Sequence, residues 1–378
     1  MDFSLSAESR AFVDRAAAFA RERVAPAAAE IDRTAVYPRV IVSEAASLGL
    51  VGMTVPAEWG GAGLDYVTYA LAVEAVAAES ATVAVILAIS NSLVAEPVVQ
   101  AGTPAQRERW LRPLVTGDVL GAFAISEADA GSDASNQQAS ARRDGDGWIL
   151  AGRKTWVANA EQAGVALVFA RAAGAPDKRS ITAFLVPLEL AGVSRTPLDS
   201  LGVRGLGCAH LDLHDVRVGD EARLGEVGDG WRIALDALAG GRVAIAAQAL
   251  GVGRSALDEA LDYARTRRAF GQRIGDFQAI QFQLADLAAD LEAARVLMWK
   301  AADARTRGSA AAMEAAMAKL QASEAAHRAA DRAMQIQASH GYQRGSRIER
   351  LFRDIRAAEI YQGTSEVQRL VISRHLVV

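Results

Sequence analysis

The sequence predicts a mainly helical protein with a β domain at its centre, and three observations support this fold class. Residues 1–120 and 229–378 are rich in alanine, with larger apolar residues at three- and four-residue steps, which is typical of packed helices. Between residues 121 and 228, short apolar runs alternate with Gly, Asp and Pro turns, which is typical of strands. No helices separate these runs, so we expect an antiparallel sheet rather than a parallel one. The chain should therefore form an N-terminal helical domain (1–120), a β domain (121–228) and a C-terminal four-helix bundle (229–378).

The N-terminal domain should begin with a helix over residues 6–23, where Phe12 and Phe19 recur at helical spacing. A second helix is expected from about residue 38 to Gly49, and another begins where Thr103 can cap a helix that has proline in its first position. Residues 81–99 form the most apolar stretch, but polar residues and a proline interrupt it. We therefore expect a buried helix there rather than a membrane span.

The β domain should contain several short strands bounded by turn residues. These strands are expected at residues 122–125, 148–150, 155–157, 165–170, 181–186 and 210–213. The bundle helices are expected at residues 231–266, 277–306, 310–339 and 368–375. Within the first of them, Gly251 and Gly253 loosely fit a dinucleotide fingerprint. They follow a helical stretch and not a strand, so close helix packing explains them better.

Composition excludes several classes of protein. The net charge of -4 is too small to indicate nucleic acid or an anionic membrane as a partner. The single cysteine, Cys208, excludes an internal disulfide framework and suits a reducing compartment. The five histidines show no metal-ligand spacing, and the N-terminal residues lack the pattern of a secretory signal. We therefore expect a cytoplasmic protein without a metal site.

One stretch near the end of the chain carries the clearest functional pattern. Gly363 breaks a helical run, and Thr364 is a good N-cap for the final helix. The turn therefore holds Gln362 beside a helix N-terminus, whose free N–H groups suit an anionic ligand. A plain corner between two helices would show the same local pattern.

Residues 358–369 resemble the C-terminal signature of the acyl-CoA dehydrogenases, and the resemblance covers the whole helical–β–helical order. In that family the pattern Tyr-Glu-Gly-Thr carries the glutamate that removes the substrate α-proton. Gln362 stands at that place, and a primary amide has no useful basicity. The resemblance also puts Arg242 beside the active site and Gly363 at the substrate, with Thr364 and Glu366 at the cofactor. Some members carry their base just before this arginine, where this chain has Gly241.

Two stretches of the β domain are similar to the flavin loops of that family. Residues 123–133 resemble the loop Thr-Glu-Pro-Gly-Ala-Gly-Ser-Asp, although Ala128 and Asp129 replace Pro-Gly. Residues 154–160 resemble Lys-x-Trp-Ile-Thr-Asn-Gly, with Ala158 in place of the threonine whose hydroxyl faces the flavin. By this resemblance the flavin ring contacts Phe123, Ile125, Ser126, Trp156 and Ala158, and Ser132 lies near the substrate.

The C-terminal bundle carries the remaining similar motifs. Residues 267–271 fit Arg-x-x-Phe-Gly, which in the family contacts the FAD of a neighbouring subunit. The resemblance thereby assigns Arg267, Phe270 and Gln278 to FAD, and implies a homotetramer or at least a dimer. Residues 335–341 match Gln-Ile-x-Gly-Gly-x-Gly, which adds Gln335 and Ser339, although Ala338 and Ser339 replace two glycines.

The resemblance implies an FAD-dependent dehydrogenation of an acyl-CoA thioester in fatty acid metabolism, with electrons passing to an electron-transfer flavoprotein. Because of Gln362, three interpretations stay open. The chain is a dehydrogenase whose glutamate has been exchanged for glutamine and which is thereby inactivated. It is a family-like flavoprotein with different chemistry or a different base. Or it is a flavin- or CoA-binding protein without catalysis.

Overall fold

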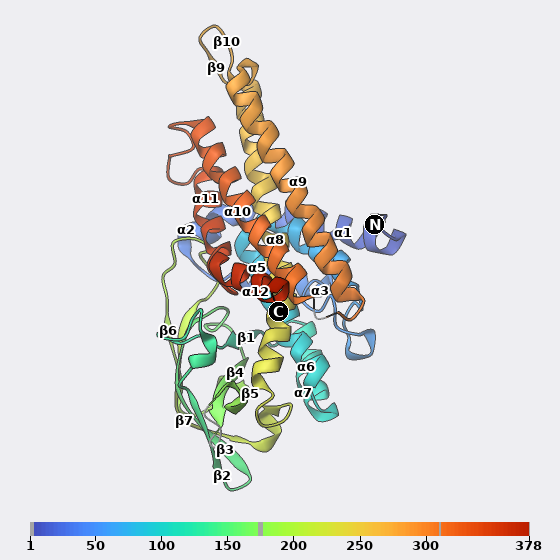
Figure 1. The fold of residues 1–378 in the computed structure, drawn as a ribbon, viewed down its shortest axis with the longest axis vertical. Helices are drawn as coiled ribbons and strands as arrows, with labels where there is room; N and C mark the ends of the chain where they lie inside the picture. The colour runs from blue at the N-terminus through green and yellow to red at the C-terminus, as the bar shows by residue number, and fades with distance from the viewer. Residues whose placement is uncertain (1–3, 173–176, 310, 378) are drawn as a thin grey trace.

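The computed structural model describes residues 4–172, 177–309 and 311–377. Figure 1 shows a helical upper part, a sheet at the lower end, and a long central helix that runs from one to the other. The N-terminal helices are α1 Ala7–Phe19, α2 Ala25–Thr34, α3 Arg39–Ser47, α4 Tyr66–Ala77, α5 Ala81–Ala88, α6 Glu96–Ala101 and α7 Pro104–Val115. Two π-helical segments, η1 Ala20–Val24 and η3 Ile89–Ala95, join α1 to α2 and α5 to α6. The first helix thus continues past residue 23, where we expected it to end.

Local sequence explains where these helices begin. The Thr103 hydroxyl accepts the Gln106 N–H (3.2 Å), and the Gln106 side chain accepts the Thr103 N–H (2.9 Å), which forms the capping box of α7. The N-cap expected at Thr103 is confirmed. The continuous helical stretch Ala81–Ala101 is apolar enough to cross a membrane, but 94% of its most apolar window is buried inside the protein. It is therefore a core helix, as expected for residues 81–99.

The strands of the β domain form one sheet within the described residues. They are β1 Gly121–Ala124, β2 Ser140–Asp144, β3 Gly147–Val157, β4 Val165–Ala172, β5 Ile181–Pro187, β6 Val193–Pro197, β7 Ala209–Gly219 and β8 Arg223–Leu224. Their order is β6-β7-β3-β2-β4-β5-β8, with β1 also paired to β4. The segments expected at 148–150 and 155–157 are one long strand, and the sequence pattern missed β2, β6 and β8.

The expectation of a wholly antiparallel sheet is wrong in two pairings. β1 and β2 both pair with β4 in parallel, with Gly121 opposite Val165 and Ser140 opposite Arg171. A parallel pair needs a crossover connection, which is usually a helix. Here the loop after β1 and the β2–β3 hairpin make the crossover, so the absence of helices did not predict the strand direction.

The C-terminal part is built on α8 Gly230–Thr266, whose most apolar window is 83% buried. The other elements are α9 Gln278–Thr306, α10 Ala312–Gln337, α11 Arg347–Ala358, α12 Ser365–Val377 and the hairpin β9 Arg268–Ala269 with β10 Gln272–Arg273. Residue 310, where we expected the third bundle helix to begin, lies outside the described residues. A Cβ at Gly253 would lie 2.6 Å from Leu291 of α9 and 2.9 Å from Ala326 of α10. This confirms that small residues here serve close helix packing.

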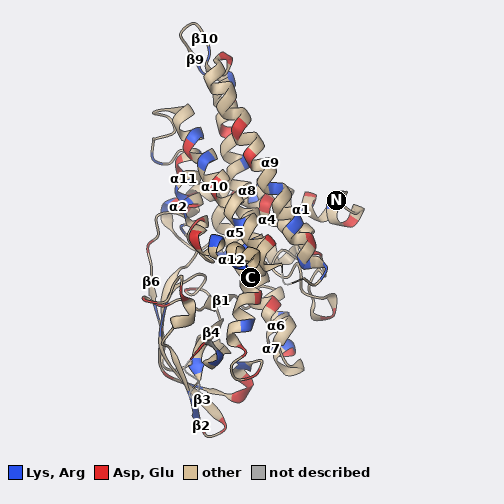
Figure 2. Cartoon of the chain, in the orientation of Figure 1, with Lys and Arg blue, Asp and Glu red and all other residues tan. Residues whose placement is uncertain are grey.

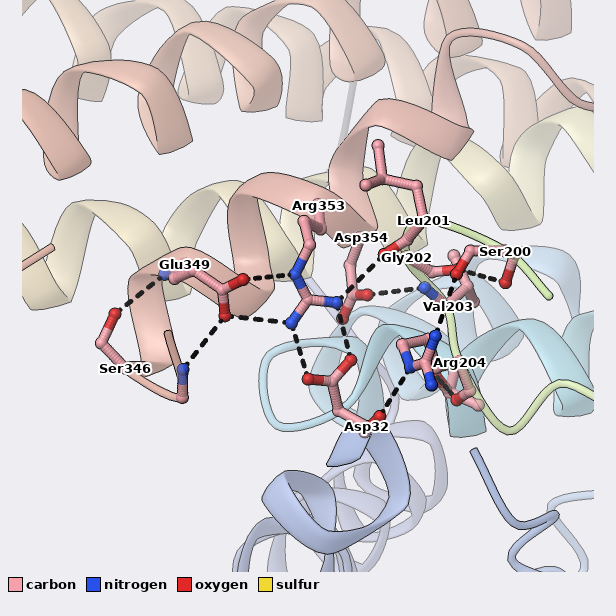
Figure 3. A network of polar contacts seen from close by, with 12 residues as sticks. Asp32, Ser200, Leu201, Gly202, Val203, Arg204, Ser346, Glu349, Arg353 and Asp354 are labelled. Atoms are coloured by element: carbon pink, nitrogen blue, oxygen red, sulfur yellow. Dashed lines mark hydrogen bonds and ion pairs between the residues drawn. The ribbon is translucent and has the colours of Figure 1, made fainter. Parts of the chain in front are cut away.

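Charged residues of both signs are interspersed along the outer helices in Figure 2. One polar network, drawn in Figure 3, joins three parts of the fold. Arg353 of α11 binds both carboxylate oxygens of Asp32 in α2 (2.6 and 2.8 Å), and Asp354 accepts the N–H of Val203 in the loop before β7 (2.6 Å). Burial raises the pKa of Asp354 to about 6. The network fixes α11, and α11 leads directly into the turn that carries Gln362.

Candidate active site

The turn between α11 and α12 has an unusual backbone. Gln362 and Gly363 are consecutive residues with positive φ, +53° and +95°. The left-handed region suits glycine but costs other residues about 1–2 kcal/mol, so the surrounding contacts must hold Gln362 there. Thr364 caps α12, as expected, because its hydroxyl accepts the Val367 N–H (3.3 Å).

Three side chains hold the two carbonyl groups of this turn. The Gln362 carbonyl accepts from Arg242 Nε (3.5 Å) and Gln368 Nε2 (3.2 Å). The Gly363 carbonyl accepts from Lys319 Nζ (2.7 Å) and Gln368 Nε2 (2.8 Å). Arg242 lies in α8, Lys319 in α10 and Gln368 in α12, so the turn is clamped from three helices.

The side-chain amide of Gln362 points into the protein. Its Oε1 atom is buried and has no hydrogen-bond partner within the described structure. A Cβ at Gly241 would collide with this oxygen and would lie 2.9 Å from Leu93 of η3. The amide therefore occupies the space that Gly241 leaves open, beside a π-helical segment of a kind often found at functional sites. An unpaired buried acceptor costs about 1–3 kcal/mol, and a ligand that donates a hydrogen bond would satisfy it.

Two buried cations contact the carbonyl groups of the turn. Arg242 is 5% exposed and Lys319 is fully buried. Burial lowers the pKa of Arg242 to about 10, and burial followed by the nearby Arg242 lowers the pKa of Lys319 to about 7. Among the described residues, neither cation forms an ion pair with a carboxylate. The turn thus carries two buried cations and the carboxylate of Glu366 at Thr364, and the side chain at its centre is neutral.

The loop after β1 is held by a second buried cluster. Lys154 donates to the Ile125 carbonyl (3.1 Å), to Glu127 Oε1 (2.7 Å) and to Gln137 Oε1 (2.7 Å). The Glu127 carboxylate also accepts the backbone N–H groups of Gln138 (2.6 Å) and Ala139 (2.9 Å). This cluster fixes residues 125–139 against β3.

The residues expected at a flavin ring lie along this loop and the end of β3. Phe123 and Ser126 are half-buried, Ile125 is buried and Ser132 is exposed. The register between β3 and β7 shifts between Lys154 and Val157, and Trp156 has a φ of +54°. This bulge turns the indole outward, where it is 59% exposed. Ala158 is half-buried. The exposed indole of Trp156 and the edge of the loop could therefore contact a flat ligand.

A cavity of about 400 Å³ opens beside the N-terminus of α12. Its walls are Glu324, His327, Arg328, Arg356, Glu359, Ile360, Thr364, Ser365 and Glu366. The Ser365 hydroxyl is buried there without a hydrogen-bond partner in the described structure. Thr364 and Glu366, both expected at the cofactor, thus line a hollow with an unsatisfied hydroxyl, two arginines and three glutamates. The Ser365 hydroxyl could bind a ribose hydroxyl of FAD, whereas Arg328 and Arg356 already pair with Asp290 and Glu359.

The other residues expected at FAD lie elsewhere in the chain. Arg267, Phe270 and Gln278 are at or next to the β9–β10 hairpin, and all three are exposed, Phe270 to 96%. Gln335 and Ser339 are exposed at the end of α10. Figure 1 places the hairpin at the end of the molecule opposite the β domain. One chain does not bring these residues to the two loops expected at the flavin, and their expected role depends on a neighbouring subunit.

Sequence reasoning missed several residues of the site. No role was expected for Lys319 or Gln368, although both hold the Gly363 carbonyl. Tyr361 donates to the buried Gln248 (2.9 Å), which anchors the residue next to Gln362 to α8. Lysine is rare in this chain, and that rarity was the one available signal for Lys319.

Comparisons with known proteins identify the family of this chain. The models of the acyl-CoA dehydrogenase N-terminal, middle and C-terminal domains match residues 6–118, 122–216 and 228–377. The chain is 44% identical over 359 residues to the human short-chain specific acyl-CoA dehydrogenase, covering 95% of this chain and 87% of the relative. It is 39% identical to the caffeyl-CoA reductase-Etf complex subunit CarC of Acetobacterium woodii, covering 91% of each chain. The solved butyryl-CoA dehydrogenase of Megasphaera elsdenii superposes with a TM-score of 0.98 at 38% identity, covering all of both chains.

These matches span the three parts of the fold and the turn at residue 362. The chain belongs to the acyl-CoA dehydrogenase family, FAD-dependent oxidoreductases that act on CH–CH bonds.

Proposed function

We propose that this protein binds FAD and a short acyl-CoA thioester, and that Gln362 occupies the place of the base for α,β-dehydrogenation. The observation that carries this proposal is the buried Gln362 Oε1 atom, which has no hydrogen-bond partner in the described structure, in a turn whose two carbonyl groups accept from the cations Arg242 and Lys319. FAD, when bound, accepts the hydride that leaves the substrate β-carbon. The chain itself must bind the thioester, exclude water and remove the α-proton.

Gln362 limits the removal of the α-proton. Its Oε1 atom accepts hydrogen bonds but does not take up a proton at neutral pH. Arg242 and the N-terminus of α12 are well placed to stabilise a carboxylate at this position, but the amide gains nothing from them. We therefore propose that the native chain binds its ligands in the family manner and abstracts the α-proton slowly.

A short acyl group is favoured by the residues beside the turn. A Cβ at Gly240, which precedes Gly241 in α8, would lie 2.5 Å from Tyr66 Oη and 2.9 Å from Glu96 Oε2. Glu96 is fixed there by Arg305 (2.6 Å). Bulky polar side chains thus fill the space beside Gly240, which supports a small acyl pocket. The names of the short-chain and butyryl-CoA relatives support the same substrate class.

The test compares the native chain with Gln362→Glu under anaerobic conditions. Both are mixed with butyryl-CoA and, separately, with octanoyl-CoA, and flavin absorbance is followed in a stopped-flow instrument. We expect the glutamate form to bleach with butyryl-CoA about a hundred- to ten-thousand-fold faster, because it regains the base. Gln343→Glu, an exposed change between α10 and α11, is the matched control and should behave like the native chain.

Other results would favour the rival interpretations. Equal, rapid bleaching by both forms would place the base elsewhere and indicate a family-like flavoprotein with a different base. Binding of FAD and butyryl-CoA without bleaching by either form would indicate a non-catalytic binding protein. A chain that takes up no FAD would contradict the proposal as a whole.

The proposal extends to partners. We propose an electron-transfer flavoprotein as the electron acceptor, supported by the Etf complex to which the CarC relative belongs. We also propose a homotetramer or a dimer, in which the exposed Arg267, Phe270 and Gln278 complete a neighbour's FAD site. Light scattering of the FAD-loaded protein would contradict this if it found a stable monomer. The cytoplasmic location stays a prediction from the sequence.

A further inference from the structure

Lysine is rare in this chain, and its placement is selective. Of 41 lysine and arginine residues only four are lysines, at positions 154, 178, 300 and 319. Lys154 and Lys319 are both fully buried, although lysine is among the residues least often buried. Lys154 holds the loop after β1, and Lys319 holds the turn at Gln362. Both buried lysines therefore donate to backbone carbonyls next to expected site residues.

Lys319 has a single role in the described structure. Its Nζ lies 2.7 Å from the Gly363 carbonyl oxygen, and no carboxylate forms an ion pair with it there. Gln368 donates to the same oxygen (2.8 Å), so hydrogen bonding alone does not require a second, charged donor. Burying an ammonium group without an ion-pair partner costs free energy. The presence of Lys319 therefore indicates that its positive charge has a role that an uncharged donor does not fill.

We propose that Lys319 is a positioning residue of the reaction centre. Its ammonium fixes the turn through the Gly363 carbonyl, so that the side chain at 362 is directed toward Gly241, and it supplies positive charge for a carboxylate at 362. The second half of this inference rests on the proposed function, in which position 362 is the place of the base.

The surroundings of Lys319 support this role. Arg242, the other cation at the turn, opposes its protonation, whereas Glu359, Glu324 and Glu366 favour it from farther away. Burial dominates, so with an amide at 362 the pKa of Lys319 is about 7. A carboxylate at 362 would add the missing negative charge and raise that pKa, and Lys319 would in turn lower the pKa of the carboxylate.

The first experiment reads this coupling without using activity. The FAD-loaded protein is labelled with [ε-¹³C]lysine, and Lys178→Arg and Lys300→Arg remove two of the four signals. The two remaining signals, from Lys154 and Lys319, are titrated by NMR with Gln362 and with Gln362→Glu. We expect one signal to titrate about one pH unit higher in the glutamate form, because a nearby opposite charge favours the charged lysine.

The second experiment identifies that signal and its effect on the reaction. In the Gln362→Glu protein we expect Lys319→Met to slow bleaching by butyryl-CoA about tenfold or more and to move the acidic limb of its pH profile upward by about one unit. Gln368→Met removes a hydrogen bond to the same oxygen but no charge, so it should slow bleaching without moving the limb. Lys300→Met is the control and should change neither.

Unchanged lysine titrations in the two forms would overturn the inference, even if the glutamate form is active. If the lysine signal titrates at a higher pH in the Gln362→Glu protein but butyryl-CoA does not bleach the flavin, the inference about Lys319 is upheld and the proposed function is contradicted. The NMR titration needs no change at Lys319, so it decides the matter if Lys319→Met fails to fold. Equal pH limbs in the Lys319→Met and Gln368→Met proteins would show that the lysine acts only as a hydrogen-bond donor, which also overturns the inference.

Discussion

The two buried lysines, Lys154 and Lys319, differ in the partners that surround their ammonium groups. Lys154 lies against Glu127, which neutralises its charge, and it also donates to Gln137 and to the Ile125 carbonyl. Lys319 donates to one carbonyl and, among the described residues, has no ion-pair partner. Burial lowers the pKa of Lys154 to about 8 and that of Lys319 to about 7. The loop after β1 is therefore held by a complete charge pair, whereas Lys319 at the turn of Gln362 has no carboxylate in an ion pair within the described structure.

The largest loss of stability should come from breaking the charge pair between Glu127 and Lys154. Glu127→Gln removes the negative charge that lies against Lys154 and weakens the acceptor for the N–H groups of Gln138 and Ala139. Leaving a buried charge unpaired typically costs about 3–5 kcal/mol, so we expect a loss of that order in urea unfolding. Asp129→Asn, an exposed change in the same loop, should stay within about 0.5 kcal/mol. A loss no larger than this control would mean that Lys154 is not charged in the folded protein.

The pH dependence of stability should separate the two lysines. Unfolded lysine stays protonated up to about pH 10.4, whereas folded Lys319 loses its proton near pH 7. Between these values unfolding takes up a proton, so the free energy of unfolding rises with pH, by at most about 1.4 kcal/mol per unit for one group. Lys319→Met should remove a rise that begins near pH 7, and Lys154→Met one that begins near pH 8. Urea unfolding at several pH values measures both, and identical slopes in the native and Lys319→Met proteins would show that Lys319 has an ordinary pKa.

A buried group of the opposite sign, Asp354, extends the comparison to α11 itself. Burial raises the pKa of Asp354 to about 6, so the folded state holds a proton that the unfolded chain releases near pH 4. Its contribution to stability is therefore present below about pH 4 and is lost as the pH rises to about 6, again by at most about 1.4 kcal/mol per unit. Asp354→Asn keeps an acceptor for the Val203 N–H and should abolish this fall. Asp199→Asn, a change at an exposed carboxylate in the same region, should leave the fall in place.

The smallest expected effect concerns the cap of α12. Thr364→Ala leaves the Val367 N–H without its acceptor and should cost about 1 kcal/mol in thermal or urea unfolding. Ser373→Ala, on the exposed face of the same helix, is the control and should cost less. An equal cost for both changes would show that the clamp of Arg242, Lys319 and Gln368, and not the cap, holds the start of α12.

Much of the fold followed from local pattern. Apolar spacing predicted α8 and α9 nearly to the residue, and the cap at Thr103 is confirmed. Strand pairing did not follow, because parallel or antiparallel direction depends on how distant segments meet and not on the residues within a strand. The polar strands β2 and β6 were missed for a related reason: they lie at the surface, so they carry little of the apolar pattern that marks a strand.

The sequence by itself determined the three-part layout, the turn at Gln362 and the absence of a carboxylate there, because helix periodicity, caps and residue identity are local properties. Only the tertiary structure decided what surrounds that turn. Arg242, Lys319 and Gln368 come from three helices and meet at two successive carbonyl groups. Their charges act through low-dielectric protein, so the electrostatics of the site depend on distances that no stretch of sequence contains.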